Sequence, residues 1–199
     1  MSKRSPNVTW KDGELTREQR WRALGHGGAT VWLTGLPAAG KSTIGAGVEK
    51  RLVAQGRPSY LLDGDNLRHG LNGDLGFSRP ARSENVRRSG HVARLLADAG
   101  LVAVVALISP YAADRDQVRE LHETGGLAFI EVWVATPLAE CERRDPKGLY
   151  ARAREGSLTG LTGVDDRYEP PLRPELIVES HVPIEAAVDD IVAALARRA

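Results

Sequence analysis

One glycine-rich segment of the chain has residue types and spacing that suit phosphate binding. It reads Gly-Leu-Pro-Ala-Ala-Gly-Lys-Ser from Gly35 to Ser42 and matches the pattern G-x-x-x-x-G-K-[S/T]. In that pattern, successive backbone N–H groups point at phosphate oxygens, and the positive end of the following helix favours an anion. Lys41 can reach the β- and γ-phosphates of ATP, and the Ser42 hydroxyl can bind Mg²⁺. The predicted ATP-binding residues are Gly35, Leu36, Pro37, Ala38, Ala39, Gly40, Lys41, Ser42 and Thr43.

Two further apolar segments end in polar residues that could act on a bound substrate. Asp63 and Asp65 lie at the end of Ser59–Asp63, and Ser109 follows Leu101–Ile108. Because ligands of open α/β sheets bind beyond the carboxyl ends of the strands, the two carboxylates could orient a substrate hydroxyl or a Mg²⁺-bound water. Ser109 could donate a hydrogen bond to the substrate or accept a phosphoryl group. The simpler alternatives are a helix-capping turn at Asp63 and Asp65, and a strand-terminating turn at Ser109.

Basic residues gather in two later segments. Arg82 and Asn85 are three apart on a predicted helix and therefore share a face. An arginine there is suited to a bidentate grip on phosphate or sulfate, although a solvated helix face is the alternative. Residues 143–150 combine arginine and lysine with glycine and proline, which suits a lid that closes over transferred charge. A basic surface loop would explain the same composition.

Apolar segments and helical patterns alternate along the chain and would position these groups. The predicted strands are 29–34, 59–63, 101–108 and 127–134, and the predicted helices are 16–24, 42–54, 82–99, 113–124, 185–198 and one that Pro137 opens. This alternation indicates right-handed βαβ units and a parallel sheet, and wholly apolar strands are typical of strands buried on both faces. The predicted fold is α/β: a P-loop NTPase-type three-layer sandwich with a mostly parallel central sheet, helices on both faces and a lid segment.

The chain divides into a short arm and one larger domain. Residues 1–28 are polar and are predicted to form an N-terminal arm with a short helix, whereas residues 29–199 form the phosphate-binding domain. Within that domain, the stretch of about 145–174 has charges, glycines and prolines but little periodicity. A long irregular stretch in a compact domain is usually a lid or a binding loop, so we predict a lid there.

The composition of the whole chain excludes several classes of protein. The 199 residues carry a net charge of +1, so no global field favours nucleic acid or an anionic membrane. No apolar segment approaches the ~20 residues that span a bilayer, and the polar N-terminus lacks the apolar stretch of a signal peptide. Cys141 is the only cysteine, which excludes an intramolecular disulfide and fits a cytoplasmic location. His69, His91 and Cys141 do not have the spacing of metal ligands.

The order of these motifs resembles the adenylyl-sulfate kinase (APS kinase) family from about Asn7 to Glu179. The resemblance rests on the stretches 62–72 (LDGDNLRHGLN), 74–78 (DLGFS), 84–88 (ENVRR), 107–111 (LISPY), 144–150 (RDPKGLY) and 162–166 (TGVDD). It implies the reaction ATP + adenosine 5′-phosphosulfate → ADP + 3′-phosphoadenosine 5′-phosphosulfate. It also implies a homodimer and a functional link to ATP sulfurylase.

The resemblance implies residue roles as well. Asp63 would orient the ribose 3′-hydroxyl and accept its proton, and Lys41 would stabilise charge on the transferred group. Phe77 would stack on the adenine of the acceptor, Lys147 would reach the acceptor from the lid, and Arg143 would lie near the adenine of ATP. The acceptor-binding residues implied are Asp63, Asp65, Asn66, Arg68, Phe77, Arg82, Asn85, Ile108, Ser109, Lys147, Gly160 and Leu161.

Three departures from the residues that are usual in the family occur along the chain. Pro37-Ala38 replaces Ser-Gly or Ser-Ser, and proline lacks an N–H, so one potential phosphate donor is lost. Leu161 stands where a phenylalanine usually clamps the adenine together with Phe77. Because base–aromatic stacking contributes roughly 1–3 kcal/mol, we expect weaker acceptor binding with the leucine. Ala81 replaces an aspartate, which removes a possible ion-pair partner of a nearby arginine.

Other functions stay open at the level of the sequence. The departures leave room for a P-loop kinase that acts on another acceptor, such as an antibiotic, a sugar acid or a nucleoside monophosphate. A low-turnover nucleotide-binding partner of a sulfurylase is a third alternative, although intact Lys41, Ser42 and Asp63 speak against it. Ser109 matches a serine proposed as a phosphoryl acceptor in the family, but direct in-line transfer needs no covalent intermediate.

Overall fold

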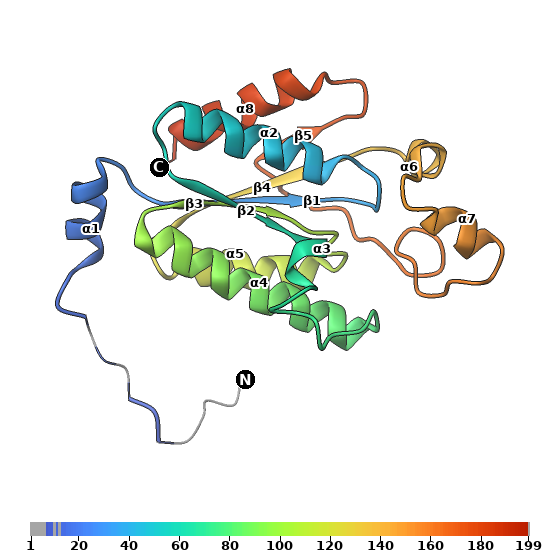
Figure 1. Cartoon of the computed structure of the whole chain (residues 1–199), viewed down its shortest axis with the longest axis horizontal. Coiled ribbons are helices and arrows are strands. Elements are labelled where there is room, and N and C mark those ends of the chain that lie inside the picture. The colour runs from blue at the N-terminus through green and yellow to red at the C-terminus, as the bar shows by residue number, and fades with distance from the viewer. Residues whose placement is uncertain (1–6, 10, 12, 199) are drawn as a thin grey trace.

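Five parallel strands form the centre of the fold (Figure 1). The computed structural model describes residues 7–9, 11 and 13–198. The strands lie in the order β2-β3-β1-β4-β5, and every pairing is parallel. This confirms the predicted α/β fold with a parallel sheet. The strands are β1 (Ala29–Thr34), β2 (Ser59–Asp63), β3 (Val102–Ala106), β4 (Ala128–Val134) and β5 (Leu176–Val178), of which β5 was not predicted.

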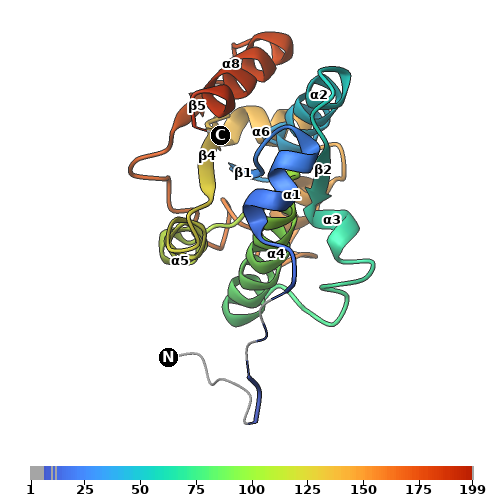
Figure 2. The same ribbon diagram turned by 90° about the vertical axis from the view of Figure 1, so that its left-hand side faces the viewer.

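Helices cover both faces of this sheet, which gives the predicted three layers. Helices α2 (Lys41–Ala54) and α8 (Ile184–Ala196) pack side by side on one face, and α4 (Arg79–Ala99) and α5 (Ala112–Glu123) pack on the other (Figures 1 and 2). Two buried apolar clusters fill the spaces between these layers. The residues of β1 and β3 are all buried, as the continuous apolar runs predicted.

Three short helices lie beyond the carboxyl ends of the strands (Figure 1). They are α3 (Gly64–Leu67), α6 (Leu138–Arg144) and α7 (Leu149–Arg154). Helix α7 lies inside the stretch 145–174 that was predicted to be irregular, so that prediction is wrong for these six residues. Asp145 starts α7 from the preceding turn, because its carboxylate accepts from Leu149 N (2.8 Å) and Ala151 N (3.0 Å). Gly148 is the N-cap and offers no side chain, so these two bonds satisfy N–H groups of the first turn and stabilise the start of the helix.

The ends of the longer helices follow from local caps. Helix α4 begins at Arg79 rather than Arg82, because Ser78 is the N-cap and Pro80 occupies the first turn. It ends at Gly100, whose φ of 102° is the left-handed conformation that favours glycine. Pro137 precedes α6 as its N-cap instead of forming its first residue.

The N-terminal helix α1 (Arg17–Leu24) lies at the opposite end of the sheet from α6 and α7 (Figure 1). Its start is fixed by a capping box between Thr16 and Gln19, which confirms the helix predicted at 16–24. Arg17 and Arg20 both bind the carboxylate of Asp98 at the end of α4. The rest of the predicted arm at 1–6, 10 and 12 lies outside the described residues. Across the described part of the chain, no helix combines the length and apolar character that crossing a membrane requires.

Candidate active site

The glycine-rich loop connects β1 to α2 at the carboxyl edge of the sheet, as predicted. Gly35 must be glycine, because a Cβ built there would lie 2.6 Å from the carbonyl oxygen of Val134. Ala38 has a φ of 60°, a left-handed conformation that an L-residue adopts at a cost of about 1–2 kcal/mol. The Pro37-Ala38 departure therefore affects the backbone of the loop as well as its N–H groups.

Lys41 lies at the start of α2 with only 8% of its surface exposed. Its Nζ donates to the carbonyl oxygens of Gly35 at 3.0 Å and Leu36 at 2.7 Å. Burial lowers the pKa of Lys41 to about 8, although the nearby Asp63 carboxylate opposes this shift. The loop thus holds a buried ammonium against two backbone carbonyl oxygens, where a bound anion would stabilise its charge.

A hydrogen bond joins this loop to the end of β2. Ser42 Oγ donates to Asp63 Oδ2 at 2.6 Å, and Asp63 Oδ1 accepts from Asp65 N at 2.9 Å. The second bond makes Asp63 the N-cap of α3, so the helix cap that the sequence suggested for Asp65 belongs to Asp63. A hydroxyl and a carboxylate side by side offer the oxygen ligands that Mg²⁺ takes together with phosphates.

Residues of the predicted lid contact both the loop and the end of β2. Tyr150 of α7 is 1% exposed, and its hydroxyl donates to Pro37 O at 3.0 Å. Lys147 forms an ion pair with Asp65, in which both side chains are more than half exposed. Lys147 of the lid and Asp65 of α3, both of which the resemblance assigned to the acceptor, are therefore brought together.

The arginines at the end of α6 differ from the prediction in their orientation. Arg143 is 73% exposed and binds Glu140 of its own helix. Arg144, which was assigned no role from the sequence, places its Nη1 3.4 Å from Ala39 O. A positive charge next to the loop is thus supplied in this structure by Arg144, one residue away from the predicted position.

Arg82 organises the second half of the site. It is 7% exposed, donates through Nε to Phe77 O at 2.9 Å and through Nη2 to Gly160 O at 2.6 Å. Its guanidinium also lies 3.4 Å from the Asp166 carboxylate. The Phe77 ring is 61% exposed and stacks against Arg68, whose guanidinium carbon is 4.3 Å from the ring centroid. One arginine therefore fixes the Phe77 segment against the segment at Gly160.

Leu161 behaves as a core residue in this arrangement. It is 6% exposed and belongs to the apolar cluster between the sheet, α2 and α8. Its N–H donates to Asp165 Oδ1 at 2.6 Å. Only the small exposed fraction of this side chain is open to a base that stacks on Phe77.

Two asparagines on the acceptor side of the site differ in the burial of their side chains. Asn85 is buried and its Oδ1 accepts from Asn72 Nδ2 at 2.6 Å, whereas Asn66 is exposed on α3. Asn72 is fully buried and was not singled out from the sequence. It fixes the orientation of the Asn85 amide, because an amide whose oxygen accepts in this way presents its nitrogen elsewhere.

Buried polar groups hold the turn after β3, which Ile108 and Ser109 form. Ser109 is 3% exposed and has a φ of 39°. Its Oγ accepts from Trp32 Nε1 at 3.1 Å and donates to Thr34 Oγ1 at 2.9 Å. The Ser109 hydroxyl therefore already serves as donor and acceptor inside the protein. We call Ile108–Ser109 the β3 turn.

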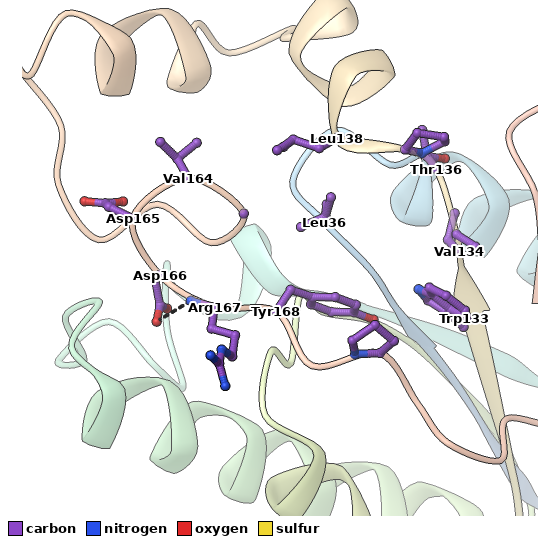
Figure 3. A pocket seen from close by; sticks show the side chains of 14 residues that line it. Leu36, Trp133, Val134, Thr136, Leu138, Val164, Asp165, Asp166, Arg167 and Tyr168 are labelled. Atoms are coloured by element: carbon purple, nitrogen blue, oxygen red, sulfur yellow. Dashed lines mark hydrogen bonds between the residues drawn. The ribbon is translucent and has the colours of Figure 1, made fainter.

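A cavity of about 580 Å³ lies beside the loop (Figure 3). Leu36 and Leu138 line one part of it, and Trp133 and Tyr168 line another (Figure 3). It includes neither Lys41 nor the carboxylates at the end of β2, so it borders the predicted phosphate site without containing it. The cavity could not be predicted from the sequence, because its walls combine Leu36 of the loop with residues 133–138 and with the distant segment 163–170.

Comparison with known proteins identifies close relatives over nearly the whole chain. The family described as adenylylsulphate kinase matches residues 27–179. A protein of Citrobacter koseri named adenylyl-sulfate kinase is 51% identical over 195 residues, which cover 98% of this chain and 94% of the relative. A Staphylococcus carnosus protein of the same name is 49% identical over 190 residues, covering 95% and 94%.

A solved structure with the same arrangement contains two nucleotides. It is the APS kinase CysC of Mycobacterium tuberculosis in complex with AMPPNP and APS, which is 49% identical to this chain. The two structures superpose with a TM-score of 0.83 over 85% of this chain and 98% of the other. The relative binds an ATP analogue and adenosine phosphosulfate on the same fold.

Proposed function

The chain belongs to the adenylyl-sulfate kinase family, and from this membership and the geometry of the site we propose its reaction and the roles of its residues. It is a P-loop kinase that transfers the γ-phosphoryl group of ATP to the 3′-hydroxyl of adenosine 5′-phosphosulfate. The products are ADP and 3′-phosphoadenosine 5′-phosphosulfate. The observation that carries the assignment of roles is the 2.6 Å hydrogen bond from Ser42 to Asp63, which joins the donor loop to the acceptor side.

The donor half of the site is the loop Gly35 to Thr43. Its backbone N–H groups and the start of α2 bind the phosphates of ATP. Lys41 moves from the loop carbonyls to the β- and γ-phosphates, where its charge is better compensated. One of the two arginines at the end of α6, Arg143 or Arg144, lies near the adenine of ATP. The contact of Arg144 with Ala39 O supports Arg144 for this role.

The residues present fit Mg²⁺. Ser42 would hold the ion, with Asp63 beside it, because both side chains offer the oxygen atoms that this ion prefers. When bound with ATP, Mg²⁺ supplies positive charge that stabilises the phosphate oxygens.

Asp63 is the residue proposed to act on the acceptor. The 3′-oxygen attacks the γ-phosphorus, its proton passes to the Asp63 carboxylate, and the bond from the γ-phosphorus to the bridging oxygen breaks, which releases ADP. A carboxylate has roughly four lone-pair sites, so the two hydrogen bonds that Asp63 accepts leave room for the hydroxyl. Positioning and charge stabilisation then supply most of the acceleration.

The acceptor nucleotide is proposed to bind between the Phe77 segment, the β3 turn and the lid. Phe77 stacks on its adenine, and the exposed ring beside Arg68 supports this role. Arg82 orders the site through its backbone contacts, and Lys147 approaches from the lid, next to Asp65. The other acceptor contacts are assigned to Asn66, Asn85, Ile108, Ser109, Gly160 and Leu161.

Several wider predictions belong to this proposal. We propose a homodimer, a functional link to the ATP sulfurylase that makes adenylyl sulfate, and a cytoplasmic location. The family membership supports the first two, and the single cysteine supports the third. Sedimentation of the purified protein at micromolar concentration would test the dimer, and a monomer mass would contradict it.

A coupled ADP-release assay tests the reaction. Robust turnover with adenylyl sulfate is the expected result, with sugar acids, nucleoside monophosphates and antibiotics as control acceptors. Turnover that appears only with a control acceptor would reassign the substrate. Nucleotide binding without turnover on any acceptor would indicate a regulatory subunit instead of an enzyme.

A further inference from the structure

Arg115 of α5 is a fully buried arginine that sits between three separate parts of the fold. It is 2% exposed, and each of its three hydrogen-bonding nitrogens contacts another element. Nε donates to Glu131 of β4 at 2.8 Å, Nη1 to Ser109 O at 2.7 Å and Nη2 to Glu169 O at 2.6 Å. A planar guanidinium can satisfy three acceptors in fixed directions, whereas an ammonium cannot reproduce that fork.

The first of these parts is the β3 turn. The positive φ of Ser109 is a conformation that costs of order 1–3 kcal/mol and persists only where the surroundings determine it. The side chain of Ser109 is held by Trp32 and Thr34, and its carbonyl is held by Arg115. Arg115 therefore contributes directly to the orientation of the backbone that the acceptor contacts.

The second part is the segment that returns from the lid, Tyr168–Glu169, which we call the return segment. Glu169 N donates to Pro110 O at 2.8 Å, and the Glu169 carboxylate accepts from Ala112 N at 2.8 Å. The hydroxyl of Tyr168 lies 3.1 Å from Thr34 Oγ1. The return segment is thus tied to the residues that follow the β3 turn and to Thr34 of β1, and Arg115 joins it to the turn itself by binding the carbonyls of Ser109 and Glu169.

The third part is Glu131 of β4, which supplies the counter-charge of Arg115 and is shared with a second arginine. Glu131 is 5% exposed and also lies 3.3 Å from Arg119 of α5. Arg119 in turn binds Glu175 at 2.8 Å. The buried carboxylate of Glu131 consequently keeps a positive partner when the Arg115 fork is lost, and Arg119 provides a matched control one helical turn away.

We propose that Arg115 is a positioning residue for the acceptor nucleotide: it holds the β3 turn and the return segment in one arrangement. This inference rests on the proposed function, because that function assigns acceptor contacts to Ile108 and Ser109. Arg115 touches neither Lys41 nor Ser42, so its effect is specific to the acceptor half of the site. Arg119 shares its helix and its buried carboxylate but contacts neither carbonyl.

The test compares Arg115→Lys with Arg119→Lys in the full-length enzyme. Arg115→Lys keeps a positive charge for Glu131 but cannot hold both carbonyls, so the KM for adenylyl sulfate should rise about tenfold. The KM for ATP should stay within about twofold, because the donor loop is untouched. Arg119→Lys should change neither KM by more than about twofold. Thermal denaturation of both variants separates a loss of stability from a loss of positioning.

The possible results distinguish a failure of this inference from a failure of the proposed function. An unchanged KM for adenylyl sulfate in Arg115→Lys, or an equal rise in Arg119→Lys, would overturn the inference while leaving the proposed function intact. If the unsubstituted enzyme does not use adenylyl sulfate, the proposed function fails, and the inference falls with it. If Arg115→Lys does not fold, Tyr168→Phe replaces it, since this variant removes the bond from the return segment to Thr34, whose hydroxyl contacts the β3 turn. It should raise the same KM about threefold, and no rise would overturn the inference.

Discussion

At the scale of single residues, the bond from Ser42 to Asp63 places a carboxylate between the two halves of the site. Asp63 caps α3 through one oxygen and accepts from Ser42 through the other. Asparagine can keep the cap, because its side-chain oxygen also serves as an N-cap acceptor. Asp63→Asn therefore removes the general base and keeps the N-cap of α3.

Asp63→Asn should lower kcat at least about 100-fold, because a positioned general base typically contributes 10²- to 10⁴-fold. Asp65→Asn is the matched control, since Asp65 also lies at this edge but is exposed and paired with Lys147. It should raise the KM for adenylyl sulfate and leave kcat within about tenfold. Steady-state kinetics measure both, and near-normal turnover of Asp63→Asn would remove the assigned role.

The lowered pKa of Lys41 predicts that the free energy of unfolding depends on pH. Burial lowers its pKa from 10.5 to about 8. Between these values the unfolded chain holds the proton that the folded chain releases, so the contribution of Lys41 to stability rises with pH. Below pH 8 both forms are protonated, and the buried charge reduces stability by its full amount.

Lys41→Met removes this charge and should abolish turnover while stabilising the nucleotide-free protein by about 1–3 kcal/mol at pH 7. The difference between the two proteins should shrink toward zero at pH 10.5. Urea denaturation at several pH values measures it. A difference that does not change with pH would show that Lys41 is not the cause.

Ser109 gives a prediction about the course of the reaction. Its hydroxyl is buried and hydrogen-bonded to Trp32 and Thr34. Ser109→Ala should lower stability by about 1–3 kcal/mol, because Trp32 Nε1 loses its partner. It should leave kcat within about fivefold, since direct in-line transfer needs no serine. A loss of three orders of magnitude in kcat, with the fold intact, would point to a phosphoserine intermediate.

At the scale of secondary-structure elements, the lid and α7 connect the donor loop to the acceptor side. Tyr150 anchors α7 on Pro37 O, and Lys147 forms an ion pair with Asp65.

Lys147→Gln should raise the KM for adenylyl sulfate about tenfold, because a charge-assisted contact to the acceptor is lost. It should leave the Tm unchanged, because an exposed ion pair contributes about 0–1 kcal/mol. The effect should weaken at high salt, and salt-independent kinetics would contradict it.

The elements that the sequence predicted are those with a long apolar pattern. Helix α4 and strands β1 and β3 have such patterns, and the structure contains them within a few residues of the predicted bounds. Strand β5 and helices α3 and α7 are three to six residues long, too short for periodicity to indicate them. Helix α3 depends on its N-cap Asp63, α7 depends on the Asp145 carboxylate that accepts from its first turn, and β5 depends on pairing with β4.

At the scale of the whole molecule, the strand order explains why the predicted site residues converge. Strands β1, β3 and β2 are neighbours in the sheet, so the loop, the β3 turn and Asp63 end at one edge. The alternation of strands and helices predicted a parallel sheet but not this order. It could not predict Arg115, Arg144, Asn72 or Tyr168 either, because their contacts span distant parts of the chain.

The most direct measurement of the central claim follows the phosphoryl group itself. Purified protein is incubated with ATP labelled at the γ-phosphate, Mg²⁺ and adenylyl sulfate, and the labelled products are separated. We expect the label to appear on the 3′-oxygen of a nucleotide that keeps its sulfate, and Asp63→Asn to lower its rate of formation at least about 100-fold. Label released only as inorganic phosphate, or transferred at the same rate by the variant, would contradict it.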